Sequence, residues 1–255
     1  MSALEAVLVL FAGMAAGTVN AIVGSGTLIT FPVLLAVGYS PVVANVSNTV
    51  GLAPGSISAA FGYRAELTGQ GQRLKVLGLA SLAGGATGGV LLLTLPENAF
   101  RAIVPVLIAL SCVLVLVQPW LTSRLAMAER RREHGGVALF VGVFLAGVYG
   151  GYFGAAQGVL LIALLGLFLD EHLQRVNAAK NVLAGIVNTI AAVLFILVSH
   201  VAGIHVAWLA SLLIAVGSVI GGQLGARIGK RTRPGVLRGL VVLVGIVAIV
   251  QIVRG

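Results

Sequence analysis

Residues 17–55 read GTVNAIVGSGTLITFPVLLAVGYSPVVANVSNTVGLAPG, an apolar stretch that carries polar side chains and helix breakers together. In hydrocarbon an unpaired polar group costs several kcal/mol, so these side chains must pair inside the protein or line a wet cavity. A second stretch, residues 147–188, repeats the layout. We expect the two stretches to face each other and to form one binding site.

The composition predicts a membrane protein. The chain has 255 residues, of which 59% are hydrophobic and 9% charged, and its mean hydropathy is +1.10. A soluble domain carries about 25% charged residues, so this chain has too little charge to cover a water-facing surface. We predict an all-α, polytopic membrane protein with a single domain, residues 1–255, that contacts the lipid bilayer.

Several function classes lack the residues they need. The net charge of +9 comes from basic residues between apolar runs, so membrane topology explains it better than nucleic-acid binding does. The only cysteine, Cys112, lies within an apolar run, so no disulfide can form within the chain. The 4 histidines lack metal-type partners at helical spacing, and no protease motif occurs in the apolar runs. We therefore predict no enzyme activity, no cofactor, no metal and no nucleic-acid partner.

The apolar runs divide into long and short segments. A spanning helix needs roughly 20 apolar residues. Two runs, 27–38 and 158–169, are too short to cross alone and are predicted to be re-entrant or half-spanning helices, each following a glycine-rich break. The N-terminal run carries Glu5 where a cleaved signal has basic residues, so it is predicted to remain as the first span. The candidate spans are 3–23, 42–62, 75–95, 99–119, 136–154, 181–199, 206–226 and 236–253.

The two halves resemble each other. A shift of 130 residues places Gly24 on Gly154, and a shift of 133 places Asn48 on Asn181. We interpret this as a diverged duplication, with repeat 1 at about 3–119 and repeat 2 at about 136–253 on either side of a basic loop, 120–135. Further pairs are Gly17 with Gly147, Ile57 with Ile190, Gly84 with Gly217, and residues 88–89 with 221–222.

Charge orients the halves, because Lys and Arg in short loops mark the cytoplasmic side. If 136–154 and 158–169 form a hairpin that returns to the cytoplasm, a loop at 170–180 also lies inside. All but Arg101 and Arg254 of the 16 basic residues then lie inside. A single crossing by 136–169 would instead export the basic loop 227–238. Each half then consists of one hairpin and three crossings, which is an odd number of side changes. The two repeats are therefore inverted relative to each other, and both termini lie outside. Inverted repeats of this kind are a transporter architecture.

The segment GTVNAIVGSGTLITFPVLLAVGYSPVVANVSNTVGLAPGSISAAFGYRAEL, residues 17–67, resembles the TauE/SafE family of sulfite exporters, the DUF81 type. Weaker echoes are GVYGGYFGAAQGVLLIALLG, VNAAKNVLAGIVN and GSVIGGQLGARIGKR in the second half. The chain departs from the family in its GSG break, in its GAAQG break, and in having Thr49 where many relatives have a lysine. The resemblance implies export of sulfite or related sulfur-containing or organic anions across the bacterial cytoplasmic membrane.

The first-half candidates for binding a substrate cluster around the break and the polar run after it. A helix that restarts near Gly26 points its unpaired N–H groups into the break, which favours an anion; Ser25 and Thr27 are equally ordinary N-cap residues. Asn45, Asn48 and Thr49 share one helical face, and they either contribute to the site or join helices by hydrogen bonds. The first-half candidates are Asn20, Gly24, Ser25, Gly26, Thr27, Asn45, Asn48 and Thr49.

The second half contributes Gln157, Asn177, Lys180 and Asn181. Lys180 lies near a predicted helix start, where the dipole disfavours a cation. An anionic substrate would explain it, and a lysine that snorkels to the interface is the alternative.

Together these features predict a transporter of a small anion, an exporter that works by alternating access, and they are compatible with a homo-oligomer. A passive anion channel and a non-transporting assembly or sensory protein are the alternatives. Anion flux in liposomes discriminates among them.

Overall fold

The computed structural model describes residues 1–125, 136–202, 204–229, 239, 242–246 and 249. Every element within these residues is a helix, which confirms the predicted all-α fold. The bounds are α1 Ala3–Ile22, α2 Thr27–Ala36, α3 Pro41–Gly62, the 3-10 helix η1 Arg64–Leu67, α4 Gly71–Thr94, α5 Glu97–Leu125, α6 Gly136–Tyr152, α7 Gln157–Phe168, α8 Leu173–Ala202 and α9 Trp208–Ile228.

The two short helices appear where the sequence predicted them. At 1.5 Å per residue, α2 and α7 are about 15 and 18 Å long, roughly half of a 30 Å hydrocarbon core. Each follows a long helix that ends at a glycine with positive φ, 88° at Gly24 and 78° at Gly154. Glycine adopts this conformation without the clash that a Cβ would cause, so α1 and α6 are each terminated by a glycine.

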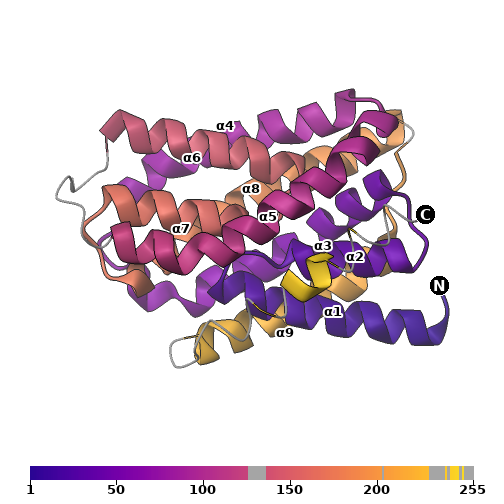
Figure 1. Cartoon of the computed structure of the whole chain (residues 1–255), viewed down its shortest axis with the longest axis horizontal. Coiled ribbons are helices and arrows are strands. Elements are labelled where there is room, and N and C mark those ends of the chain that lie inside the picture. Colours follow the sequence, from indigo (N-terminus) through magenta and orange to yellow (C-terminus); the bar gives the residue numbers. More distant parts are fainter. Residues whose placement is uncertain (126–135, 203, 230–238, 240–241, 247–248, 250–255) are drawn as a thin grey trace.

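The helices pack in a regular order across the molecule (Figure 1). α1 lies on α9, α9 on α3, α3 on α8, α8 on α4, and α4 on α6. If α1 to α4 correspond in order to α6 to α9, the pair α1 and α9 corresponds to the pair α6 and α4, and the pair α3 and α9 to the pair α8 and α4. A duplicated chain predicts such matching pairs. The inverted orientation of the two repeats stays a prediction.

Equivalent glycines bring the outer helix pairs together. A Cβ on Gly221 of α9 would lie 2.0 Å from the carbonyl oxygen of Met14 in α1, and a Cβ on Gly88 of α4 would lie 2.0 Å from that of Val148 in α6. Only glycine permits such close helix packing, the usual device of membrane bundles. Gly88 and Gly221 are the residues that the shift of 133 had paired, so the repeat in the sequence corresponds to a repeated contact.

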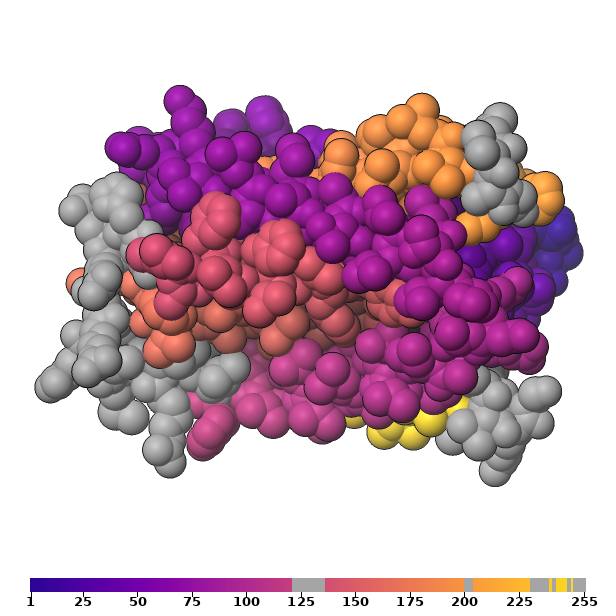
Figure 2. All heavy atoms as spheres, turned by 90° about the horizontal axis from the view of Figure 1, so that it is seen from above, coloured from indigo at the N-terminus to yellow at the C-terminus, as the bar shows by residue number. Residues whose placement is uncertain are grey.

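The outer surface suits a bilayer. Five described helices are long and apolar enough to span one: α1, α4, α5 as far as Trp120, α8 as far as Ser199, and α9. Large apolar side chains such as Leu79, Val106 and Leu145 are exposed on α4, α5 and α6, which cover much of the face seen in Figure 2. The protein is therefore a multi-pass membrane protein.

The predicted loops were too long. α8 begins at Leu173, so Arg175 and Lys180 lie within a helix and not in a loop at 170–180. Likewise α4 begins at Gly71, which places Arg73 in its first turn. The prediction had counted only apolar residues, whereas a helix continues through polar residues when their side chains find partners. Residues 120–125 of the predicted loop 120–135 belong to α5, and its remaining residues, like most of the predicted span 236–253, lie outside the described residues.

Candidate functional site

The two glycine-rich breaks touch each other. The backbone N–H of Gly158 donates a hydrogen bond to the carbonyl oxygen of Gly24 over 3.0 Å. A Cβ on either residue would lie 2.4 Å from the Cα of the other, closer than side-chain carbons pack. The two stretches that were predicted to face each other therefore meet at these glycines.

Both short helices begin beside this contact. Neither α2 nor α7 has a side-chain cap at its N-terminus. The hydroxyl oxygen of Thr27, the first residue of α2, lies 3.8 Å from where a Cβ on Gly154 would stand, so the start of α2 reaches the second break. Several of the first N–H groups bond to backbone carbonyls of the breaks, as Leu28 does to Ser25 and Gly158 to Gly24. The positive end of each helix dipole still makes this place attractive to an anion.

Hydrogen bonds to a carbonyl fix the backbone of the second break. The carbonyl oxygen of Ala155 accepts bonds from the hydroxyls of Tyr149, at 2.6 Å, and Ser111, at 3.1 Å. The next residue, Ala156, has φ of 59°, a left-handed conformation that costs a non-glycine residue about 1–2 kcal/mol. The two hydroxyls hold the chain in this shape and so fix the direction in which α7 starts.

Three side chains of α8 cap the C-terminus of α1. The carbonyl oxygen of Ala21 accepts from the amides of Asn177, at 3.1 Å, and Asn181, at 3.2 Å. The ammonium of Lys180 donates to the carbonyl oxygens of Asn20, at 2.8 Å, and Ala21, at 3.2 Å. Lys180 is fully buried, and the negative end of the α1 dipole favours its charge.

The C-terminus of α6 has a matching cap from the other half. The amide of Asn45, in α3, donates to the carbonyl oxygen of Tyr152, the last residue of α6, over 2.9 Å. Thus α3 of the first half caps the broken helix of the second, and α8 of the second half caps that of the first. The caps differ in charge, because only α8 supplies a lysine.

Four buried polar groups beside the breaks have no hydrogen-bond partner among the described residues. They are the hydroxyls of Ser25 and Tyr152, the amide nitrogen of Gln157 and the amide oxygen of Asn45. Ser25 is completely buried, and Gln157 is 3% exposed. An unsatisfied buried polar group costs about 1–3 kcal/mol, so a polar ligand at this place would satisfy groups that the protein leaves free.

Of the remaining predicted residues in α3, Asn48 bonds to the start of α2 and Thr49 bonds within its own helix. The amide of Asn48 donates to the hydroxyl of Thr27 over 3.2 Å and accepts a bond from Thr30, which ties α3 to the start of α2. The hydroxyl of Thr49 donates to the carbonyl oxygen of Asn45 in its own helix, and no hydrogen bond among the described residues links it to the breaks.

Asn20 lies in the last turn of α1, and the partner of its side chain was not predicted. Its amide donates to the hydroxyl of Ser56 over 3.2 Å, and Asn188 donates to the same hydroxyl over 2.9 Å. Sequence reasoning missed Ser56 and Thr30. Ser56 lies seven residues after Thr49 and therefore on nearly the same helical face, and this spacing is the signal that could have identified it.

An ion cluster joins the two halves at one end of the bundle. Glu171, between α7 and α8, binds Arg73 of α4 at 3.1 Å and Arg175 of α8 at 2.6 Å. Arg175 also donates to the carbonyl oxygen of Thr68 over 3.0 Å. Burial alone would raise the pKa of Glu171, but the hydrogen bonds from Arg175 and Arg73 outweigh it and lower the pKa below its usual range.

Glu171→Gln is expected to lower the free energy of unfolding by about 1 kcal/mol at neutral pH. Because the pKa of Glu171 is lower in the folded protein, its contribution is present above the unfolded pKa and is lost as pH falls through the folded value. The difference from wild type, measured by thermal unfolding in detergent, should therefore vanish in acid. Lys75→Gln, an exposed change on α4, is the control, and an equal loss from it would contradict the role of the cluster.

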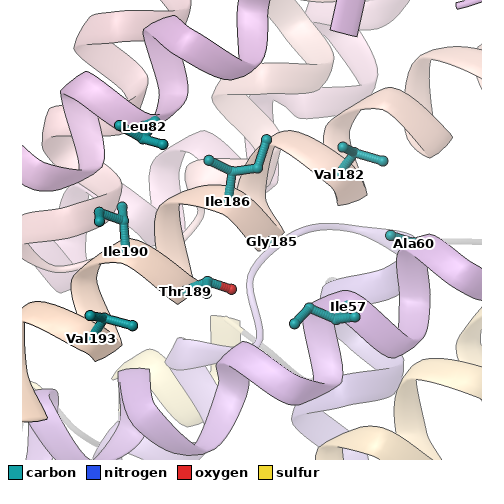
Figure 3. A pocket seen from close by; sticks show the side chains of 9 residues that line it. All are labelled: Ile57, Ala60, Leu82, Val182, Gly185, Ile186, Thr189, Ile190 and Val193. Carbon is teal, nitrogen blue, oxygen red and sulfur yellow. The ribbon is translucent and has the colours of Figure 1, made fainter. Parts of the chain in front are cut away.

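A separate apolar cavity of about 460 Å³ lies between α3, α4 and α8 (Figure 3). Thr189 is the one polar side chain on its wall, where it projects among isoleucine, valine and leucine side chains. Such a cavity suits hydrocarbon and offers little to an anion. Its lining residues are Ile57, Ala60, Leu82, Val182, Gly185, Ile186, Thr189, Ile190 and Val193.

Comparisons with known proteins agree with this architecture. The family described as "Sulfite exporter TauE/SafE" matches residues 9–252. The "Probable membrane transporter protein YfcA" of Escherichia coli (strain K12) is 29% identical over 248 residues, covering 93% of this chain and 85% of the relative. A "Probable membrane transporter protein" of Haemophilus influenzae is 26% identical over 234 residues, covering 91% and 88%. No solved structure matches the chain.

Proposed function

The chain belongs to the TauE/SafE family, and from this premise we propose that it exports a small anion, such as sulfite, an organosulfonate or a related organic anion. The proposed location is the bacterial cytoplasmic membrane. The family and its named relatives make the protein a membrane transporter of the TauE/SafE type. One observation supports the proposed anion: the breaks before two helices without side-chain N-caps meet at Gly24 and Gly158, beside buried polar groups that have no partner among the described residues.

The anion would bind at this junction. The hydroxyl of Ser25 and the amide of Gln157 would donate to its oxygens, and the positive dipole ends of α2 and α7 would favour its negative charge. Asn48 would hold Thr27 in place, while Lys180 would supply the positive charge from the end of α1. Asn177 and Asn181 are positioning residues in this proposal, since their amides bond Ala21.

Inverted repeats that rock against each other would open the junction to the two sides in turn. The breaks belong to different halves, so such a movement would separate Gly24 from Gly158. An inside-negative potential favours the exit of an anion by about 2.3 kcal/mol per charge and 100 mV, which is consistent with export without a coupling ion.

Counterflow in proteoliposomes tests the proposed function. Labelled sulfite or methanesulfonate should enter vesicles preloaded with the unlabelled anion, with a saturable rate that exceeds that of empty vesicles. Trans-acceleration by unlabelled substrate supports a carrier over a passive channel. If folded protein gives no saturable flux of any of these anions, export of this substrate class is wrong, and an assembly or sensory role gains support.

The predicted topology has its own test. In a Cys112→Ser background, a cysteine tag added at Met1 and, in a second variant, one added at Gly255 should both react with a membrane-impermeant maleimide applied to intact cells. An odd number of side changes in each half puts both ends on the same side, and the basic loop between the halves, placed inside, makes that side the outside. Labelling that appears only after lysis, at either end, would contradict the inverted arrangement.

A further inference from the structure

We propose that the junction selects anions with a single negative charge, and that Lys180 sets this preference through its charge without being a ligand. The inference rests on the proposed function and specifies its substrate class. It starts from a charge count. Among the buried residues that the structure describes, Lys180 is the only one with a formally charged side chain.

The four helix ends at the breaks add little to this count. The C-termini of α1 and α6 and the N-termini of α2 and α7 all lie at the two breaks. Each carries a dipole end equivalent to roughly half an elementary charge, negative for the first two and positive for the others. These contributions largely cancel, which leaves about one positive charge at the junction, that of Lys180.

The position of Lys180 explains how it acts at a distance. Its ammonium is held by the carbonyl oxygens of Asn20 and Ala21, while its Cδ passes 2.9 Å from where a Cβ on Gly158 would stand. The side chain therefore runs alongside the start of α7 to the end of α1. The charge lies close to the junction, but its hydrogen bonds are directed to the helix end.

The groups left to contact an anion are neutral. The hydroxyl of Ser25 and the amide nitrogen of Gln157 are buried donors without a partner in the part of the chain that the structure describes, and neither adds charge. One negative charge would neutralise the junction. A second would remain uncompensated in a medium of low dielectric constant, where an unpaired charge is strongly disfavoured.

Three tetrahedral oxyanions test the inference on the purified full chain by calorimetric titration at constant ionic strength. Methanesulfonate and perchlorate carry one charge, whereas sulfate carries two and has the same shape as perchlorate. The two monoanions should bind at least about 100-fold more tightly than sulfate. Sulfate binding that equals either monoanion would overturn the charge selection but leave an anion site. Absence of binding by all three would overturn the site and the inference with it.

Variants distinguish the effect of the charge of Lys180 from that of the neutral hydrogen-bond donors. Lys180→Met should weaken methanesulfonate binding by about 100-fold and remove the preference over sulfate, while Lys180→Arg should retain the preference. Ser25→Ala should weaken both monoanions by up to about tenfold and leave the ratio to sulfate unchanged. An unchanged ratio in folded Lys180→Met would overturn the role of Lys180. If that variant does not fold, the wild-type comparison and Lys180→Arg still decide the question.

Discussion

Gly158→Ala should abolish anion transport, whereas Gly166→Ala on the same helix should leave it intact. A Cβ on Gly158 would lie 2.4 Å from the Cα and 3.0 Å from the carbonyl oxygen of Gly24. Both are backbone atoms, so no rotation of a side chain can relieve the contact. The start of α7 would have to move away from the first break, and the junction would lose its shape.

The control separates this contact from an effect of glycine itself. A Cβ on Gly166 would meet nothing within 4 Å, and alanine favours a helix over glycine by up to about 1 kcal/mol. Gly166→Ala should therefore be as stable as wild type or slightly more so, while Gly158→Ala should lose about 1–3 kcal/mol as well as flux. Thermal unfolding and counterflow measure the two effects. Wild-type flux from Gly158→Ala would show that contact between the breaks is not required.

Lys180→Met is expected to separate anion binding from folding. Ala21 keeps the amide donors of Asn177 and Asn181, so the end of α1 stays capped when the ammonium is gone. Burying a charge is itself costly, and an apolar chain of similar length removes that cost. The free energy of unfolding should therefore change by no more than about 1 kcal/mol, while affinity for methanesulfonate falls by about 100-fold.

The matched change is Asn181→Leu, which removes a neutral donor to the same carbonyl oxygen. It should destabilise the fold by about 1 kcal/mol and preserve the charge selection. Titration calorimetry and unfolding in detergent on both variants give the comparison. If Lys180→Met bound methanesulfonate as wild type does, the lysine would be a structural cap only, and the source of positive charge at the junction would have to lie elsewhere.

The breaks could be predicted from the sequence because their signal is local. Glycines beside polar residues, followed by apolar runs of about half a span, predicted α2 and α7 closely. The pairing of Gly24 with Gly154 also corresponds to two helix ends with positive φ. The close glycine contacts of α4 and α9 belong to residues that the repeat had paired.

The partners of Lys180 could not be predicted in the same way. The sequence placed Lys180 near a helix start, where the helix dipole disfavours a cation, and suggested an anion as the compensation. In the structure α8 begins at Leu173, so Lys180 lies beyond its first turn. The structure supplies another partner, the C-terminus of α1, which only the folded chain brings near. The exchange of caps, with Asn45 on α6 and Asn177 on α1, depends on contacts between halves that no local pattern encodes.

The most direct test is to locate a bound anion. Crystals of the full chain grown with bromomethanesulfonate, a monoanion, allow the bromine to be found by anomalous scattering. The account predicts a single strong peak beside the contact of Gly24 with Gly158, within reach of Ser25 and Gln157. A peak found only elsewhere, such as at Arg73 and Arg175, in protein that transports this anion would contradict it.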